Sequence, residues 1–319
     1  MKACVDIGGT KVAVGLAPPG TGPRALQARR AEPTAKAGPP GALAAQVLRM
    51  LDAACAEAGV ARADLRAVGV AACGPFALQG GAVELVTPNI CGGLAEPGTG
   101  PANHWTSAPL QAPLAEALGP GVVLAVENDA VAALRAERLW GALRGVRNAA
   151  YVTWSTGIGV GLCVDGHVLR GKAGNAGHAG HSFASDGPAW ALCGCGNQGD
   201  VESLAAGGSM QRLHGRDAGA LIGAAQAGDP VARAAVAQAC RVLGRMLYNL
   251  VVALDLERIS LGGAVLLHHA PYLLPQLRAE VEGRLPALTR GVGIVPAGLG
   301  LAVGDYAPLA LVEALAGSH

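Results

Sequence analysis

The chain contains the same local pattern twice: a strand runs into a glycine-rich turn and returns as a second strand. In the first copy, residues 2–7 lead into the turn at 8–11, and residues 12–16 resume an apolar strand. In the second copy, residues 149–153 lead into 155–161, where glycines alternate within a strand pattern. Glycines at such turns leave backbone N–H groups uncovered. Each copy is either an anion-binding hairpin or an ordinary glycine bulge, but two such hairpins can face one polyphosphate from opposite sides.

A second feature is Glu127-Asn128-Asp129, which lies between an apolar strand predicted over residues 121–126 and a helix predicted over 130–143. Open α/β sheets bind ligands beyond the carboxyl ends of their strands. The Asp129 carboxylate is therefore placed to accept a proton from a bound hydroxyl. The spacing is also that of an N-cap, in which Asn128 or Asp129 accepts a backbone N–H of the first helical turn. Alone, the segment favours the cap, whereas the two hairpins favour a functional role.

Periodicity predicts further elements. A helix is expected over residues 42–58, and a strand over 67–72 that ends in Cys73-Gly74-Pro75. Asp229 followed by Pro230 predicts the start of a long helix to about residue 254. The Gly- and Pro-rich stretch 80–101 is expected to be either a loop beside a cleft or a plain connector.

Composition limits the class of protein. A chain of 319 residues is long enough for two domains, and 51% hydrophobic with 3% aromatic residues is typical of a compact α/β protein. A net charge of +1 gives no reason to expect a nucleic acid or an acidic membrane as a partner. No apolar stretch has the length and low charge of a membrane span, and no signal segment precedes Asp6, so a cytoplasmic protein is expected.

Taken in order, these motifs resemble the ROK family of sugar kinases and sugar-responsive repressors. The resemblance rests on motifs spread over almost the whole chain: Asp6-Ile7-Gly8-Gly9-Thr10-Lys11, Glu127-Asn128-Asp129-Ala130, Ser155-Thr156-Gly157-Ile158-Gly159, Gly177-His178-Ala179-Gly180-His181, Cys193-Gly194-Cys195 through Glu202, and Leu261-Gly262-Gly263. It implies an α/β protein of the actin-like ATPase (ribonuclease H-like) fold, with two lobes and a central cleft. The expected small lobe comprises residues 1–120 plus 304–319, and the large lobe, which carries the sugar and zinc loop, comprises 121–303.

The same resemblance implies an ATP- and Mg²⁺-dependent kinase that phosphorylates a hexose, most often glucose at its 6-hydroxyl, with lobes that close on the sugar and a homodimer as the assembly. Asp129 would be the general base. The implied sugar-binding residues are Gly74, Asn128, Asp129, His178, His181 and Glu202. The implied nucleotide and phosphate residues are Asp6, Gly8, Gly9, Thr10, Lys11, Thr156, Gly157, Gly159, Gly262 and Gly263.

Two positions depart from the family pattern. Where the family has Glu-x-Gly-His, with the glutamate on the sugar, this chain has His178. An imidazole cannot accept two hydrogen bonds at once as a carboxylate can, so either the sugar's O1 and O2 are held differently, the preferred sugar differs, or His178 only packs.

The second departure is in the zinc loop. The family uses one histidine and three cysteines, whereas this chain has His181, Cys193, Cys195 and, for the third cysteine, Asp200. Aspartate is an accepted zinc ligand, but it is harder than thiolate, so weaker retention of a structural Zn²⁺ is expected. A metal-free loop with reduced thiols is the alternative.

The intact Asp129, and the few residues before Asp6, favour an enzyme over a repressor or a non-catalytic sugar sensor. Substrate choice stays open among glucose, N-acetylglucosamine, N-acetylmannosamine, mannose and fructose, and a donor other than ATP, such as polyphosphate, is not excluded.

Overall fold

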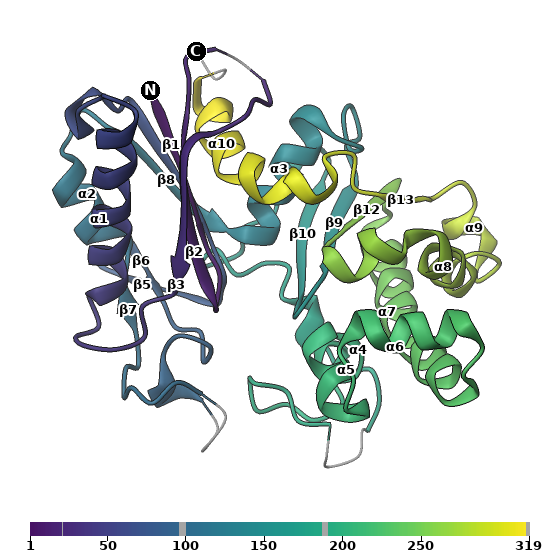
Figure 1. Ribbon diagram of the computed structural model, residues 1–319. Helices are drawn as coiled ribbons and strands as arrows, with labels where there is room; N and C mark the ends of the chain where they lie inside the picture. The colour runs from purple at the N-terminus through teal and green to yellow at the C-terminus, as the bar shows by residue number, and fades with distance from the viewer. Residues whose placement is uncertain (21, 96–99, 187–190, 317–319) are drawn as a thin grey trace. The chain divides into compact units, whose positions relative to one another are not determined.

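The computed structural model describes residues 1–20, 22–95, 100–186 and 191–316 (Figure 1). Its contacts divide the chain into two units. Unit 1 comprises Met1–Trp140, Arg170–Asn175 and Ala302–His319, and unit 2 comprises Gly141–Leu169 and Ala176–Leu301.

Unit 1 is built on a five-stranded sheet with the order β3-β2-β1-β4-β8. Its first three strands are antiparallel, and β1, β4 and β8 run parallel. The strands are β1 (Lys2–Ile7), β2 (Lys11–Ala17), β3 (Gln27–Pro33), β4 (Ala67–Ala72) and β8 (Val123–Asn128). A second, three-stranded sheet contains β5 (Phe76–Gln79), β6 (Ala82–Leu85) and β7 (Ala108–Pro109), so strands occupy part of the expected 80–101 loop.

Helices cover both faces of the five-stranded sheet, which is why β1 is apolar on both sides. Ala3, Val5 and Ile7 pack in the core cluster that contains α1, whereas Cys4 packs with Leu309 of α10. Figure 1 shows α1 and α10 on opposite faces of this sheet. The helices of the unit are α1 (Ala42–Glu57), α2 (Gln111–Leu118), α3 (Asp129–Trp140) and α10 (Val303–Ala316), with the short turns η1 (Arg62–Asp64) and η2 (Gly92–Leu94). Because side chains alternate along a strand, Asp6 shares the α10 face with Cys4.

Unit 2 repeats this sheet. Its order is β11-β10-β9-β12-β13, again antiparallel over the first three strands and parallel over the last three. The strands are β9 (Ala149–Trp154), β10 (Ile158–Val164), β11 (His167–Val168), β12 (Arg258–Gly262) and β13 (Gly293–Pro296). The same topology in both units confirms the predicted repeat and is that of the actin-like ATPase fold.

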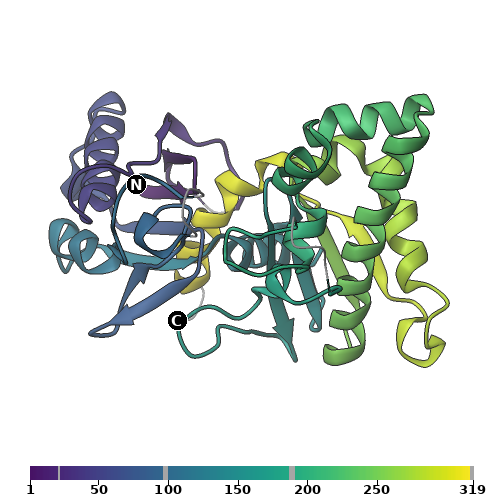
Figure 2. The same cartoon turned by 90° about the horizontal axis from the view of Figure 1, so that it is seen from below.

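The helical part of unit 2 packs on that sheet through one core cluster. It comprises α4 (Val201–Ala205), α5 (Gly207–His214), α6 (Ala218–Ala227), α7 (Pro230–Leu254), α8 (Ala264–Val281) and α9 (Pro286–Thr289), with the turns η3 (Ala179–His181) and η4 (Gly300–Ala302) beside it. The long helix α7 runs beside α8, in green and yellow-green in both Figure 1 and Figure 2. Helix α8 is kinked at His269, where φ is −127°, next to Pro271.

The first continuous stretch of unit 1 ends at Trp140, beyond the expected boundary at residue 120. The reason is that β8 pairs with β4 along its whole length and α3 packs on α10. Residues 170–175 also belong to unit 1 although they lie between stretches of unit 2.

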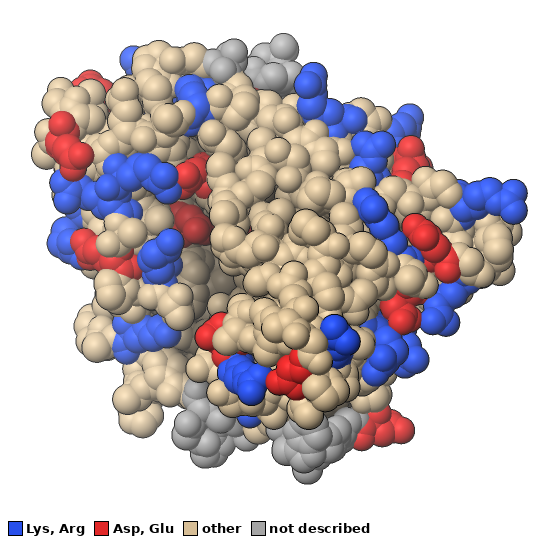
Figure 3. All heavy atoms as spheres, turned by 45° about the vertical axis from the view of Figure 1, so that its right-hand side comes forward, with Lys and Arg blue, Asp and Glu red and all other residues tan. Residues whose placement is uncertain are grey.

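Within the described residues, none of the helices combines the length and hydrophobicity that crossing a membrane requires. On the face drawn in Figure 3, Lys and Arg are interspersed with Asp and Glu over a mostly uncharged surface. That face carries no single-sign patch of the kind that binds nucleic acid.

Candidate active site and metal cluster

The carboxyl ends of three parallel strands bring the predicted residues of unit 1 to one edge of its sheet. Ile7 of β1 pairs with Ala72 of β4, and Ala72 pairs with Asn128 of β8. The segments that follow these strands are the Gly8 hairpin, the Cys73-Gly74 loop and the start of α3. Their meeting at this edge matches the position at which open α/β sheets bind ligands.

Asn128 caps α3, and Asp129 is the first residue of that helix. The Asn128 side-chain oxygen accepts hydrogen bonds from the backbone N–H groups of Ala130 at 3.0 Å and Val131 at 3.3 Å. The Asp129 carboxylate accepts from Ala130 N–H at 2.8 Å and lies in the first turn, where the helix dipole favours a negative charge. The cap and the functional role are therefore compatible, because the cap fixes Asn128 and leaves its amide donors for a ligand.

Asp6 lies close enough to Asp129 for their charges to interact. Burial, followed by repulsion from Asp129, raises the pKa of Asp6 to about 7, and the Lys11 ammonium opposes this shift. A buried carboxylate whose ionised form is disfavoured by a second carboxylate fits a site completed by a cation such as Mg²⁺, which prefers oxygen ligands.

The Gly8–Lys11 hairpin is held from outside by Thr34. Thr34 Oγ1 donates to the Gly8 carbonyl at 2.7 Å, and Thr34 N–H donates to the Thr10 carbonyl at 3.1 Å. A Cβ on Gly9 would lie 3.1 Å from Cβ of Asn89, so this glycine allows a close approach. Thr10 and Lys11 are exposed, which leaves a hydroxyl and an ammonium at a fixed turn for an anion.

The loop after β4 lies beside the same carboxylates. Burial, then repulsion from Asp129 and Asp6, raises the pKa of the Cys73 thiol. The loop includes a cis peptide bond between Gly74 and Pro75. Sequence reasoning missed what holds it: Asn175 accepts from Phe76 N–H and donates to the Phe76 carbonyl, both at 2.8 Å.

A buried glutamate, Glu127, directly precedes Asn128 and Asp129. Glu127 is 4% exposed, and its carboxylate pairs with Arg170 at 3.1 Å and with Arg135 at 3.6 Å. These contacts tie β8 to α3 and to the short segment 170–175. Neither arginine had a local sequence signal, since each meets Glu127 only in the folded chain.

In unit 2, Glu202 joins the second glycine-rich turn to the loop of candidate metal ligands, residues 193–200. Its Oε2 accepts a hydrogen bond from Ile158 N–H at 2.8 Å, and Cys193 Sγ lies 3.7 Å from its Oε1. A Cβ on Gly157 would be 2.8 Å from Glu202 Oε2, so the glycine is needed for this approach. Thr156 is exposed beside it.

His178 and His181 flank the turn η3, which lies on β10. A Cβ on Gly180 would collide with the Ile158 carbonyl and one on Gly177 with the Val160 carbonyl, so these glycines let the turn pack directly on the strand. The two imidazole rings are stacked, with centroids 6.1 Å apart. His178 thus lies beside His181, and its contact with the sugar stays a prediction.

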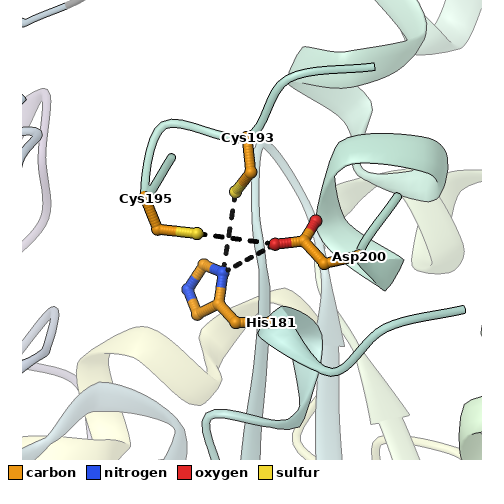
Figure 4. A group of neighbouring side chains, drawn as sticks. All are labelled: His181, Cys193, Cys195 and Asp200. Carbon is orange, nitrogen blue, oxygen red and sulfur yellow. Dashed lines mark hydrogen bonds and ion pairs between the residues drawn. The ribbon is translucent and has the colours of Figure 1, made fainter. Parts of the chain in front are cut away.

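Four predicted metal ligands converge (Figure 4). The ligand atoms of His181, Cys193, Cys195 and Asp200 all lie within 4.8 Å of one another. His181 Nδ1 is 3.4 Å from Asp200 Oδ2 and 3.6 Å from Cys193 Sγ, and Cys195 Sγ is 3.5 Å from Asp200 Oδ2. Donors bound at about 2.0–2.3 Å around a tetrahedral zinc ion lie about 3.3–3.8 Å from one another, so these three distances and the donor types fit zinc.

Asp200 has a second task that a cysteine would not perform. Its Oδ1 accepts from Ser203 N–H at 2.7 Å and caps α4, which leaves Oδ2 for the metal cluster. Burial acts to raise the pKa of Asp200, but the hydrogen bonds from His181 and Ser203 outweigh it and the pKa is lowered. The hydrogen bond to Asp200 raises the pKa of His181.

The glycine pair at the end of β12 has a packing reason. A Cβ on Gly262 would collide with the Tyr151 side chain and one on Gly263, at φ +87°, with the Trp154 backbone. Both residues lie against β9. The expected place of Gly262 and Gly263 beside the adenosine, and that of Gly159 beside the phosphates, stay predictions.

Comparison with known proteins agrees with this geometry. The model of the ROK family matches residues 2–304. The chain belongs to the ROK family. It is 34% identical over 283 residues to an N-acetylmannosamine kinase of Salmonella newport, which covers 86% of each protein.

Two solved ROK structures extend this agreement to the fold. A ROK hexokinase from Thermus thermophilus is 32% identical, with a TM-score of 0.77 over 98% of both chains. A ROK glucokinase from Streptomyces griseus, in complex with glucose and AMPPNP, is 26% identical, with a TM-score of 0.64 over 96% of this chain and 97% of the other. The expectations of ROK membership and of an actin-like ATPase fold are confirmed.

Proposed function

We propose that this ROK-family sugar kinase transfers the γ-phosphoryl group of ATP to N-acetylmannosamine. The observation that carries the choice of sugar is the 34% identity to an N-acetylmannosamine kinase over 283 residues. It is supported by His178, at the one sugar-side position where this chain departs from the family glutamate. A changed residue at that position is expected for a sugar whose substituents differ from those of glucose.

Glucose, the substrate expected from the sequence, is the second candidate. The similarity to a ROK hexokinase at 32% identity and to a ROK glucokinase favours it, as do Asn128, Asp129, His181 and Glu202, which are all present. N-acetylglucosamine, mannose and fructose belong in the same test.

The proposed mechanism assigns the acceptor proton to Asp129. Phosphoryl transfer to an alcohol requires positioning, neutralisation of phosphate charge and a carboxylate near the attacking hydroxyl. Asn128 would orient the sugar through its amide donors, and Thr10, Lys11 and Thr156 would bind phosphate oxygens. Mg²⁺ bound with the nucleotide would neutralise phosphate charge, with Asp6 as the residue nearest to it.

We also propose a structural zinc ion held by His181, Cys193, Cys195 and Asp200. Ligand spacing and donor type support it. Because Glu202 follows Asp200 by two residues, the metal would fix the position of a sugar-binding carboxylate as well as that of His181.

A coupled assay that measures ADP release from ATP over a panel of hexoses and N-acetylhexosamines tests the function. The expected result is the highest kcat/KM for N-acetylmannosamine. A higher kcat/KM for glucose would instead favour glucose as the substrate. Asp129→Ala should lower kcat more than about 100-fold, as expected for a positioned general base. Sugar-dependent ATP consumption that persists in Asp129→Ala would remove this residue from the mechanism.

Two expectations about assembly belong to the proposal. Closure of two lobes on the sugar should change small-angle scattering when sugar is added, because closure excludes water that would compete as the acceptor. A homodimer should be visible by light scattering.

A further inference from the structure

Helix α5 begins directly against the second glycine-rich turn. Gly207 N–H donates to the Ser155 carbonyl at 2.8 Å, and Gly208 N–H donates to the Thr156 carbonyl at 3.0 Å. Figure 1 shows α5 at the end of β9 and β10 where this turn lies. These two helix N–H groups are used by the turn itself, so a bound anion at this place needs its positive charge from a side chain.

Arg212, one helical turn further along α5, is placed to supply that charge. Its Nη1 lies 3.7 Å from the position that a Cβ on Gly208 would take, and the same position lies 3.4 Å from Thr156 Cγ2. The guanidinium therefore lies on the side of α5 that contacts the turn, beside the exposed Thr156.

Ser209 holds the Arg212 side chain in this place. Arg212 Nη2 donates to Ser209 Oγ at 2.9 Å, and Ser209 Oγ donates to the Glu202 carbonyl at 2.6 Å. Ser209 is 1% exposed, so the hydroxyl that receives the guanidinium is itself fixed. The arrangement orders a long side chain that would otherwise be free in solvent.

In the part of the chain that the structure describes, no carboxylate pairs with the Arg212 guanidinium. Among the described residues, Arg212 forms no ion pair, and its one hydrogen bond is to a neutral hydroxyl. Arg216, a few residues later, differs because its Nη1 is 3.1 Å from Asp229 Oδ2. A guanidinium that is positioned but unpaired offers a planar set of donors of the kind that binds phosphate oxygens.

We propose that Arg212 binds the phosphate chain of the phosphoryl donor at the Ser155–Gly157 turn, with Ser209 as its positioning residue. This rests on the proposed kinase function and adds a residue that the family motifs did not indicate. The ligand chemistry is a phosphoanhydride chain, which ATP and inorganic polyphosphate share. A solvated surface arginine without a ligand is the competing explanation.

Direct binding by isothermal titration calorimetry separates these explanations without requiring turnover. Wild type, Arg212→Ala, Arg212→Lys and the charge-matched control Arg216→Ala are titrated with Mg²⁺-ATP, Mg²⁺-ADP, AMP and tripolyphosphate. Loss of charge-assisted hydrogen bonds to phosphate should weaken ATP binding about 10- to 100-fold in Arg212→Ala. Arg212→Lys should lose less, because it keeps the charge without the fork, and Arg216→Ala should bind like wild type.

The dependence on phosphate number identifies the contact. AMP affinity should change less than ATP affinity in Arg212→Ala, and sugar affinity should stay within about twofold of wild type. A comparable loss of tripolyphosphate affinity would show that Arg212 recognises the phosphoanhydride chain in either donor. A loss of affinity confined to ATP and ADP would show that it recognises the phosphates of a nucleotide. Ser209→Ala should weaken ATP binding by a smaller factor than Arg212→Ala.

Equal affinities of wild type and Arg212→Ala for every ligand would overturn the inference, as would equal losses for AMP and ATP. If Arg216→Ala lost ATP affinity to the same extent, the effect of Arg212→Ala would come from the lower net charge of the protein and not from a contact with phosphate. If wild type itself binds no nucleotide or polyphosphate, the proposed function fails first, so the two failures are distinguishable.

Discussion

Glu202 accepts a hydrogen bond from the backbone N–H of Ile158, at 2.8 Å. This contact gives an expected sugar-binding carboxylate a second role at the start of β10, next to Gly157. Oε2 of Glu202 thus supports the Ser155–Gly157 turn, while Oε1 lies 3.7 Å from Cys193 Sγ and is the oxygen left for the expected sugar contact. The roles of the two oxygens can be separated by mutation.

Glu202→Gln should separate them, because its amide oxygen can still accept from Ile158 while its NH₂ replaces an acceptor on the sugar side. We expect the sugar KM to rise about tenfold with the ATP KM within about twofold of wild type. Glu202→Ala removes both contacts and should raise both KM values. Gly157→Ala serves as a companion, because its Cβ would lie 2.8 Å from Glu202 Oε2 and displace it. Identical effects of Gln and Ala on the ATP KM would contradict the two-role assignment.

Asn175 should control sugar affinity through Phe76, although neither residue is an expected sugar ligand. Asn175→Ala removes two hydrogen bonds that fix the residue after Gly74-Pro75. We expect a sugar KM about 5- to 20-fold higher, with kcat and the ATP KM little changed. Asn148→Ala is the control, since Asn148 makes its contacts in unit 2, with Asp165 and Glu257. An equal rise in both KM values would mean general loosening of unit 1.

The sequence predicted the elements that carry their own local signals. Asp229 does cap α7, accepting from Val231 and Ala232 N–H, and β1, β4 and β9 lie where apolar runs placed them. No helix was predicted over residues 201–227, because α4, α5 and α6 are short and rich in Ala and Gly. The prediction also missed α8, whose Pro271 and Pro275 interrupt the helical pattern.

The residues of the candidate site were likewise predictable only where they belong to local sequence motifs. Asp129, His181 and the Cys193–Asp200 ligands belong to local motifs, and the structure brings the metal ligands together. The supports of the site are non-local: Asn175 is 99 positions from Phe76, and Arg170 is 43 from Glu127. No periodicity or spacing in the chain encodes such pairs, so only the folded structure identifies them.

His178→Glu should shift substrate preference toward glucose. A carboxylate restores the family residue and accepts two hydrogen bonds at once, as suits neighbouring sugar hydroxyls, whereas imidazole cannot. We expect the ratio of kcat/KM for N-acetylmannosamine to that for glucose to fall about tenfold or more. His268→Glu, at an exposed position of α8, controls for the added charge. An unchanged ratio would mean that His178 does not contact the part of the sugar that distinguishes the two substrates.

Asp6 should make the stability of the ligand-free protein pH-dependent. Burial and the neighbouring Asp129 raise the pKa of Asp6 from its ordinary value of 3.8 to about 7, so the folded state favours the protonated form. The stability that this group contributes is complete below its unfolded pKa and is lost as the pH rises through about 7. Asp6→Asn removes the titration, so its Tm should exceed that of wild type by an amount that grows between pH 5 and pH 8. Parallel Tm curves for the two proteins over that range, without Mg²⁺ or nucleotide, would show that Asp6 does not titrate there.

The last prediction concerns the candidate metal cluster: purified protein should contain zinc, and its loss should weaken sugar binding without abolishing nucleotide binding. The four ligand atoms lie within 4.8 Å of one another, and a bound ion would fix His181 and the loop that leads to Glu202. Asp200→Asn keeps an oxygen for the α4 cap but lacks the charged ligand. We expect less zinc by elemental analysis and a sugar KM that rises by a larger factor than the ATP KM.

The matched control is Asp217→Asn, which alters the equivalent cap of α6, where Asp217 accepts from Ala220 N–H. Asp200→Cys should retain zinc longer than wild type in the presence of a chelator, because thiolate is the softer ligand and aspartate the harder one. Chelation of the wild type should reproduce the kinetic effect of Asp200→Asn. If the protein is fully active without stoichiometric zinc, the prediction is wrong, and the loop is held by the hydrogen bonds among His181, Asp200 and Ser203.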